Sequence, residues 1–377
     1  MSIVNGFADS PVVVIGIDGG GTKTVAVLAD ANGRELARSV GAGANLQTVG
    51  AVVVRERIGA LIGDLLSGVT GASTVRGLAV SLAGVDRPAD VPVATEAILG
   101  AIADFTASGQ STAATPSSLV ATRFASSDAN DHDGQGRAPH GPLWELPGGL
   151  PIVTNDAVAA LAAGASTLDG VVVIAGTGSI AFGVCNGVRA RAGGWGSILG
   201  DEGSGFGLGI GALRAVCRAH DGRAPATSLT GAVLAQVGAS TPPDLIGIVS
   251  AKTWGVAETA AVAPVVVREA EAGDAVASEL VDEAASELVA SARAVIDALP
   301  FERSRDLPIV LAGGLWPASA RLRDGFASRL SEHVPNARPS VSAHEPVEGA
   351  VWLARHQAGL LPATPSSLIA IRSGDGA

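Results

Sequence analysis

The chain contains the same strand–turn–strand pattern twice, and this duplication constrains its fold more than any other feature. Residues 12–24 are a β-branched run that ends in Asp-Gly-Gly-Gly-Thr-Lys-Thr, and residues 171–179 are a second such run that ends in Gly-Thr-Gly-Ser. Each turn is followed by an apolar stretch and then by an Asn-Gly pair, at 32–33 and 186–187. Asn-Gly between strand-like runs is a strong hairpin signal because both residues tolerate positive φ. The sequence therefore predicts two related lobes, each built on a three-stranded meander.

The glycine turns within these two meanders predict phosphate binding. Without β-carbons, backbone N–H groups converge on an anion, and neighbouring Thr, Ser and Lys side chains add donors. Lys23 is one of only two lysines in the chain, and its position inside the first turn therefore favours a functional role. Two such turns predict one nucleotide held between the lobes. The expected phosphate-binding residues are Gly20, Gly21, Thr22, Lys23, Thr24, Gly176, Thr177 and Gly178.

Length, charge and cysteine content narrow the class of protein. The 377 residues exceed one usual core and predict two domains. A net charge of −11 argues against nucleic acid or an anionic membrane as the main partner. Cys185 and Cys217 form no CxxC pair, and residues 1–16 lack the basic start of a secretory signal. We therefore expect a soluble protein of the cytoplasm.

The order of apolar patterns predicts an α/β protein with two lobes. We expect an N-terminal lobe at 1–155, a C-terminal lobe at 156–354, and a tail at 355–377 that returns to the first lobe. Residues 106–149 are rich in Ser, Thr, Pro, Gly and Asp without periodicity, which predicts a flexible surface insertion. Beyond the meanders, the patterns predict helices at about 51–67, 93–105, 156–164, from 207, and over most of 244–299, strands at 77–82, 151–154 and 309–312, and a closing strand and helix within 340–360.

The carboxylate at the end of the first strand is a candidate metal ligand. The chain has no Walker A sequence, no G-x-G-x-x-G, no G-x-S-x-G elbow and no H-E-x-x-H. Phosphoryl transfer needs cradled phosphates, Mg²⁺ and a base for the acceptor hydroxyl. Because Mg²⁺ usually keeps several waters and takes one or two carboxylates, Asp18 could suffice as its ligand. Asp18 could also simply open a turn, but the seven-residue motif favours the metal role.

Asp156 is the candidate general base. A strand runs into Asn155-Asp156 at a predicted helix start, where the helix dipole keeps a carboxylate ionised. The alternative is that Asn155 or Asp156 serves only as the helix N-cap. The position just before the second phosphate hairpin favours the catalytic interpretation.

A third glycine-rich segment, residues 193–205, predicts recognition of a polyol. It combines Gly-Gly-Trp-Gly with Gly-Asp-Glu-Gly-Ser-Gly, and so offers one flat ring and two adjacent carboxylates. Carboxylates accept hydrogen bonds from hydroxyls, and rings cover apolar faces of sugars. Alternatively, Trp195 belongs to a core, and Asp201 and Glu202 cap the following helix. For Glu202 both interpretations stay open.

With these motifs in order, the chain resembles the BadF/BadG-type ATPase family of the actin-like sugar kinase superfamily, and within it most of all the N-acetylglucosamine kinases. The resemblance covers nearly the whole chain except 106–149. It implies a two-lobed actin-like ATPase fold of duplicated ribonuclease H-like domains with a nucleotide cleft between the lobes. The motifs that carry it begin at Asp18, Gly43, Ser81, Thr154, Gly176, Gly194, Gly200 and Gly313.

The resemblance also implies roles for particular residues. Asp156 matches the catalytic aspartate, and Gly313 and Gly314 match a turn on the adenosine side. Ala263 aligns near the adenine. The positions that match sugar contacts, or lie near the sugar, are Asn45, Ser81, Asp156, Gly194, Trp195, Gly196 and Asp201. The iron–sulfur branch of the family binds its cluster through cysteines, and this chain has no suitable pair.

The implied reaction is ATP- and Mg²⁺-dependent phosphorylation of an amino sugar at its 6-hydroxyl. N-acetylglucosamine is the expected substrate, with glucosamine or N-acetylmuramic acid as alternatives. A hypothesis of another class is a sugar-sensing ATP-binding protein without turnover. The resemblance also implies a homodimer.

Overall fold

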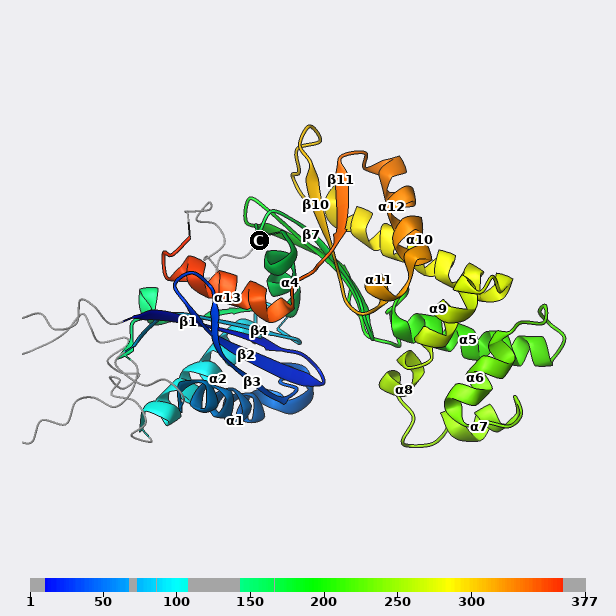
Figure 1. Ribbon diagram of the computed structural model, residues 1–377, viewed down its shortest axis with the longest axis horizontal. Helices are drawn as coiled ribbons and strands as arrows, with labels where there is room; N and C mark the ends of the chain where they lie inside the picture. Colours follow the sequence, from blue (N-terminus) through cyan, green and yellow to red (C-terminus); the bar gives the residue numbers. More distant parts are fainter. Residues whose placement is uncertain (1–10, 68–72, 86, 108–142, 166, 362–377) are drawn as a thin grey trace, which may run out of the picture. The chain divides into compact units, whose positions relative to one another are not determined.

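The protein, seen in a computed structural model, consists of two compact units (Figure 1). The structure describes residues 11–67, 73–85, 87–107, 143–165 and 167–361. The first unit contains the described residues up to 165 and those from His344 onward, and the second contains Thr167–Ala343. The chain thus leaves its first unit once and returns to it.

The first unit is built on a mixed sheet with the strand order β3-β2-β1-β4-β5, in which β6 also pairs with β4. Its strands are β1 (Val12–Gly19), β2 (Lys23–Asp30), β3 (Glu35–Ala42), β4 (Thr74–Leu82), β5 (Leu143–Trp144) and β6 (Ile152–Thr154). The first three form an antiparallel meander, whereas β4 runs parallel to both β1 and β6. The carboxyl ends of β1, β4 and β6 therefore lie at the same edge of the sheet.

The second unit repeats this topology. Its sheet has the order β11-β10-β7-β8-β9, with an antiparallel meander and two further parallel strands. The strands are β7 (Gly170–Ala175), β8 (Ser179–Cys185), β9 (Val188–Gly193), β10 (Leu307–Ala312) and β11 (Ala337–Val341). Asn186 and Gly187 both have positive φ, as the tight β8–β9 turn requires. The repeated order confirms the duplicated α/β fold predicted from the sequence.

Helices cover both faces of the first sheet (Figure 1). They are α1 (Leu46–Ser67), α2 (Asp90–Phe105), α4 (Asp156–Ala165) and α13 (Pro346–Gln357). Helix α13 lies so close to its neighbours that β-carbons at Gly77 and Gly349 would overlap backbone atoms of Ala354 and Ala159. These two glycines thus permit the last described helix to pack onto β4 and α4.

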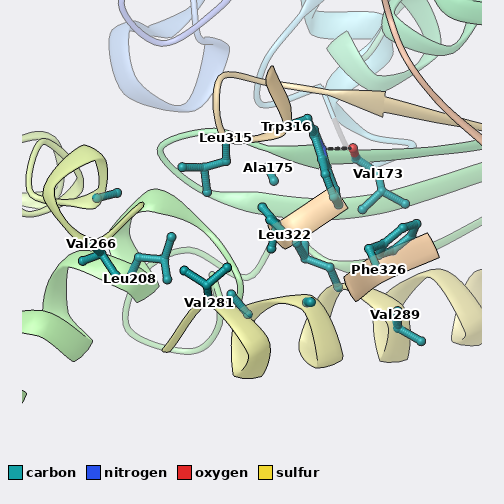
Figure 2. Packing of buried hydrophobic residues seen from close by; sticks show 14 of the residues in the cluster. Val173, Ala175, Leu208, Val266, Val281, Val289, Leu315, Trp316, Leu322 and Phe326 are labelled. Carbon is teal, nitrogen blue, oxygen red and sulfur yellow. Dashed lines mark hydrogen bonds between the residues drawn. The ribbon is translucent and has the colours of Figure 1, made fainter. Parts of the chain in front are cut away.

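The core of the second unit lies between its sheet and its helices (Figure 2). The helices are α5 (Gly205–His220), α6 (Leu229–Val237), α7 (Asp244–Val249), α8 (Val256–Ala260), α9 (Ala263–Glu271), α10 (Ala275–Asp297), α11 (Leu315–Ala318) and α12 (Ala320–His333). Trp316 is fully buried, packs edge-on against Phe326 with ring centroids 5.1 Å apart, and donates a hydrogen bond of 3.0 Å to the carbonyl of Val173. This indole fixes α11 to the central strand β7.

The structure differs from the sequence analysis near the expected insertion and at the limits of the units. Most of 106–149 lies outside the described residues, but Leu143–Trp144 forms β5, and the side chains of Trp144 and Leu146 are buried in the first core. The unit limits fall at 166/167 and 343/344, whereas 155/156 and 354/355 were expected, because α4 and α13 pack on the first sheet. None of the helices in the described ranges is both long and apolar enough to span a membrane.

Candidate active site

Polar side chains from three neighbouring strands meet at the carboxyl edge of the first sheet. Asp18 at the end of β1 is the register partner of Ser81 on β4, and Ser81 is that of Thr154 on β6. The buried Ser81 hydroxyl lies 3.1 Å from Asp18 Oδ1 and 3.2 Å from the carbonyl oxygen of Ile17, and it can donate to either. The hydroxyl of Thr154 is also buried and has no hydrogen-bond partner among the described residues. Parallel pairing thus brings together residues that are more than sixty positions apart in sequence.

The carboxylate of Asp18 has an unusual environment. Burial, followed by the negative charge of Asp156, raises its pKa from 3.8 to about 6. The hydrogen bond from Ser81 and the positive charge of Lys23 act in the opposite direction. Asp18, Asp156 and Lys23 are therefore near enough to interact, as a phosphate-transfer site would require.

Helix α4 begins at Asp156, and its N-cap is Asn155. Asn155 Oδ1 accepts a hydrogen bond of 3.1 Å from the backbone N–H of Val158. The cap is thus supplied by the asparagine, and Asp156 occupies the first helical position, where the helix dipole favours a negative charge. This geometry weakens the alternative in which Asp156 is only a cap, and its role as a base stays a prediction.

The first glycine turn projects from β1 and β2 into solvent. A hydrogen bond of 2.9 Å from the Gly20 N–H to the Lys23 carbonyl closes it, and Gly21, Thr22 and Lys23 are exposed. Thr24, in contrast, is fully buried, and its hydroxyl donates to the carbonyl of Ala42 at 2.8 Å. The side chain of Thr24 therefore holds the meander together, whereas its neighbours in the turn are free to meet a phosphate.

Asn45 is positioned at the start of α1 and serves as its cap. Its Oδ1 accepts hydrogen bonds from the backbone N–H groups of Gln47 and Thr48 at 3.0 and 3.2 Å. Because this oxygen already accepts two hydrogen bonds, a contact with a sugar would fall to the side-chain NH2 group. A substitution at Asn45 would also remove the cap of α1.

The second glycine turn is packed against the loop before α5. Asp201 accepts a hydrogen bond of 3.1 Å from the N–H of Ser179, and the Ser179 hydroxyl donates to the carbonyl of Glu202 at 2.6 Å. Burial raises the pKa of the Asp201 carboxyl above its ordinary value, while the hydrogen bond from Ser179 lowers it. The cap of α5 is Ser204, which accepts from the N–H of Gly207. The N-cap of α5 is therefore Ser204, and the alternative in which Asp201 caps this helix is wrong.

The tryptophan of the 193–205 segment is on the surface of the second unit. Its side chain is 63% exposed, with the Arg191 guanidinium 4.9 Å from the ring centroid. Gly194 and Gly196 on either side have positive φ, which turns the chain sharply around the ring. The alternative in which Trp195 belongs to a core is wrong, and an exposed ring remains available to cover a ligand.

The residues expected on the adenosine side are spread over three elements of the second unit. Gly313 follows β10 with φ of 102° and lies against the end of β7, and Gly314 is the N-cap position of α11. Ala263, at the start of α9, is only 1% exposed and packs in the core. Its side chain is therefore not accessible to a nucleotide, and it could only pack beneath residues that contact one.

Two residues near these sites carried no usable signal in the sequence. Glu345, the N-cap of α13, adds negative charge near Asp18 although more than three hundred positions separate them, and only the return of the chain brings it there. Ser179 stood in the glycine motif without an assigned role. Its inward direction could not be deduced without knowing the partner loop.

The carboxylates of the first unit are ligands of the kind that Mg²⁺ takes. The first unit offers hard carboxylate oxygens at Asp18 and Asp156, and no group of three or more His, Cys, Asp or Glu suited to a metal occurs among the described residues. A protein cage for zinc or calcium needs more ligands, whereas Mg²⁺ is typically held by one or two carboxylates, waters and substrate phosphates. A divalent cation would also offset the repulsion between these two carboxylates.

Two sheets of one topology, each with a glycine turn between its first two strands, define an actin-like ATPase. Sequence comparison agrees with this class, because the model of the BadF/BadG/BcrA/BcrD ATPase family matches residues 150–354. The chain belongs to the BadF/BadG/BcrA/BcrD ATPase family.

Similar proteins of known name support the same placement. The chain is 30% identical over 356 residues to the N-acetyl-D-glucosamine kinase of Dictyostelium discoideum. The matched region covers 91% of this chain and 97% of that protein. The chain is 36% identical over 210 residues to the N-acetylmuramic acid/N-acetylglucosamine kinase of Clostridium acetobutylicum, covering 55% of this chain and 68% of that one. The solved structure of a candidate N-acetylglucosamine kinase from Chromobacterium violaceum is 25% identical, with a TM-score of 0.61 over 91% of this chain and 98% of that chain.

Proposed function

We propose that this protein is an ATP-dependent sugar kinase that phosphorylates N-acetylglucosamine at its 6-hydroxyl. The observation that carries the proposal is the carboxylate pair of the first unit, in which Asn155 takes the helix cap and Asp156 interacts with Asp18. The relative from Dictyostelium discoideum, which matches over nearly the whole chain, supports the choice of sugar.

In the proposed reaction, Asp156 accepts the proton of the sugar's 6-hydroxyl as that oxygen attacks the γ-phosphorus of ATP. The bond between the γ-phosphorus and the β–γ bridging oxygen breaks, and ADP leaves. Asp156 lies at the positive end of α4, where the helix dipole favours a negatively charged side chain. Asp18 would hold Mg²⁺, which neutralises phosphate charge when bound.

The two glycine turns supply the proposed phosphate contacts. In the first, the exposed Thr22 and Lys23 complete the cradle, and in the second the hydroxyl of Thr177 is exposed in the same way. For the sugar we propose contacts from Asn45, Ser81, Gly194, Trp195, Gly196 and Asp201. For the adenosine side we propose Gly313 and Gly314, with Ala263 behind them.

The test of the base is Asp156→Asn, which keeps the size of the side chain. We expect it to retain ATP binding and to lower kcat about 10²- to 10⁴-fold, the usual contribution of general base catalysis. Turnover is measured by coupled ADP release, and binding by calorimetry. Near-normal turnover would remove Asp156 from the mechanism.

The test of the substrate is a sugar panel at saturating MgATP. We expect kcat/KM to be highest for N-acetylglucosamine, followed by N-acetylmuramic acid, glucosamine and glucose. N-acetylmuramic acid is the second candidate because the Clostridium acetobutylicum relative is named for both sugars. If another sugar has the highest kcat/KM, the substrate assignment changes and the assignment as a sugar kinase stands. Binding of ATP and sugar without any turnover would favour the sensing hypothesis.

We further expect the enzyme to act in the cytoplasm as a homodimer. Light scattering after size-exclusion chromatography measures the oligomeric state directly.

A further inference from the structure

The second glycine turn is bound to the 193–205 loop along both of its sides. Three of the bonds are between backbone groups, and each joins one residue of the turn or of the start of β8 either to one end of that loop or to Phe206, the next residue, in α5. They run from the Gly205 N–H to the Gly176 carbonyl at 2.7 Å, from the Phe206 N–H to the Thr177 carbonyl at 3.0 Å, and from the Gly194 N–H to the Ser179 carbonyl at 3.0 Å. The proposed phosphate turn and the proposed sugar loop thus share one hydrogen-bonded framework.

Ser179 adds the two remaining bonds and stands at the centre of this framework. Its hydroxyl donates to the Glu202 carbonyl at 2.6 Å, and its N–H donates to Asp201 Oδ1 at 3.1 Å. Ser179 is itself buried; its bond to Asp201 is buried as well, and its bond to Glu202 is partly buried. A displacement of Asp201 or Glu202 by a ligand would therefore reach the phosphate turn directly.

The loop has little freedom to move without the turn. Asp201 has a φ of 63°, in the left-handed region that a non-glycine residue adopts only when its surroundings hold it there. A β-carbon at Gly178 would lie 2.7 Å from Asp201 Oδ1, so the carboxylate is pressed directly against the turn. Strain in one element and close packing in the other indicate two elements that adopt their conformations together.

We propose that Ser179 is a positioning residue that couples the sugar loop to the phosphate turn, so that sugar and ATP strengthen each other's binding. The inference rests on the proposed function, because it takes 193–205 as the sugar loop and 176–179 as a phosphate turn. Sugar bound to the loop fixes Asp201 and Glu202, and through Ser179 it fixes the turn in the conformation that receives phosphate. By linkage, ATP must then raise the affinity for sugar by the same factor.

The experiment compares binding constants with and without the second ligand. Calorimetry gives the Kd of magnesium adenylyl imidodiphosphate in the absence and in the presence of saturating N-acetylglucosamine, and the reverse titration gives the Kd of the sugar. For the unmodified protein we expect a ratio of at least about fivefold in both directions, at the lower end of usual coupling between sites. Ser179→Ala, which removes the hydroxyl bond to Glu202 and keeps the backbone bond to Asp201, should lower both ratios by at least about twofold, whereas Ser179→Thr, which keeps the hydroxyl, should preserve them.

Ser319→Ala is the matched control. Ser319 is also a buried serine of the second unit, and its hydroxyl accepts from the Leu322 N–H as the N-cap of α12; its hydrogen bonds go to residues of α11 and α12. It should lower the melting temperature and leave both ratios unchanged. The proposal is overturned if Ser179→Ala keeps the ratios, if Ser319→Ala abolishes them equally, or if the unmodified protein phosphorylates the sugar with a ratio of one. If the unmodified protein neither binds nor phosphorylates any sugar, the proposed function fails as well.

Discussion

Replacing Asp18 by asparagine should make the protein more stable at neutral pH while removing its activity. Burial, together with the charge of Asp156, raises the pKa of Asp18 from 3.8 to about 6. At about 1.4 kcal/mol per pH unit, the ionised carboxylate costs the folded state up to about 3 kcal/mol. Asparagine has the same shape, and its Oδ1 can still accept the hydrogen bond from Ser81, so that only the charge is removed.

The sign of the pH dependence follows from linkage. Because the folded protein holds the proton of Asp18 more tightly than the unfolded chain, the free energy of unfolding falls as pH rises from 3.8 to about 6. The gain from Asp18→Asn should therefore be nearly absent at about pH 4 and complete at about pH 7.5. Urea denaturation followed by tryptophan fluorescence measures it at both values, and coupled ADP release measures the accompanying loss of turnover.

Asp90→Asn is a control in the same unit for which we expect the opposite change in stability. Asp90 is buried, and hydrogen bonds from Arg87 lower the pKa of its carboxyl below 3.8. Its contribution is present above the ordinary pKa, so the variant should lose stability at both pH values. A loss of stability in Asp18→Asn at neutral pH, or a gain that is the same at both pH values, would contradict the raised pKa of Asp18.

Substitutions at three further positions test the packing of the first unit by urea denaturation. Trp144→Phe should stay within about 1 kcal/mol of the unmodified protein, because the buried indole N–H has no partner among the described residues, whereas Trp144→Ala should cost about 3–5 kcal/mol. Gln357→Leu should cost about 1–3 kcal/mol for each group left unpaired, since Gln357 accepts from the Leu78 N–H and donates to the Leu150 carbonyl. Gly349→Ala should cost at least about 1–3 kcal/mol, because its β-carbon would overlap the backbone of α4. An unchanged midpoint for Trp144→Ala, Gln357→Leu or Gly349→Ala, or a large loss of stability for Trp144→Phe, would contradict the packing described.

Local patterns predicted the elements well because their signals lie within a few residues. The β-branched runs, the glycine turns and the Asn-Gly pairs each describe a single hairpin, and the second pair has the positive φ values that such a hairpin requires. The repeat of the pattern then implied the duplicated sheets. Placing Asp18 and Asp156 in one site required only the further rule that parallel strands end at one edge.

What the sequence could not predict depends on contacts between distant segments. Leu146 has no periodic neighbours, and it is buried because β5 pairs with β4 beside it. Gln357 completes the hydrogen bonding of Leu78 from 279 positions away. Likewise, nothing in the motif 20–24 distinguishes the exposed Lys23 from the buried Thr24, because that depends on how β3 pairs with β2.

The return of the chain to its first unit has a consequence for the order in which the protein can fold during synthesis. Helix α13, which packs on β4 and α4, emerges from the ribosome only after every residue of Thr167–Ala343. The second unit is therefore complete while the first still exposes the apolar surface that α13 covers. Domains usually fold in the order of translation. Here, however, the first unit lacks its last helix, α13, until the whole second unit has been synthesised.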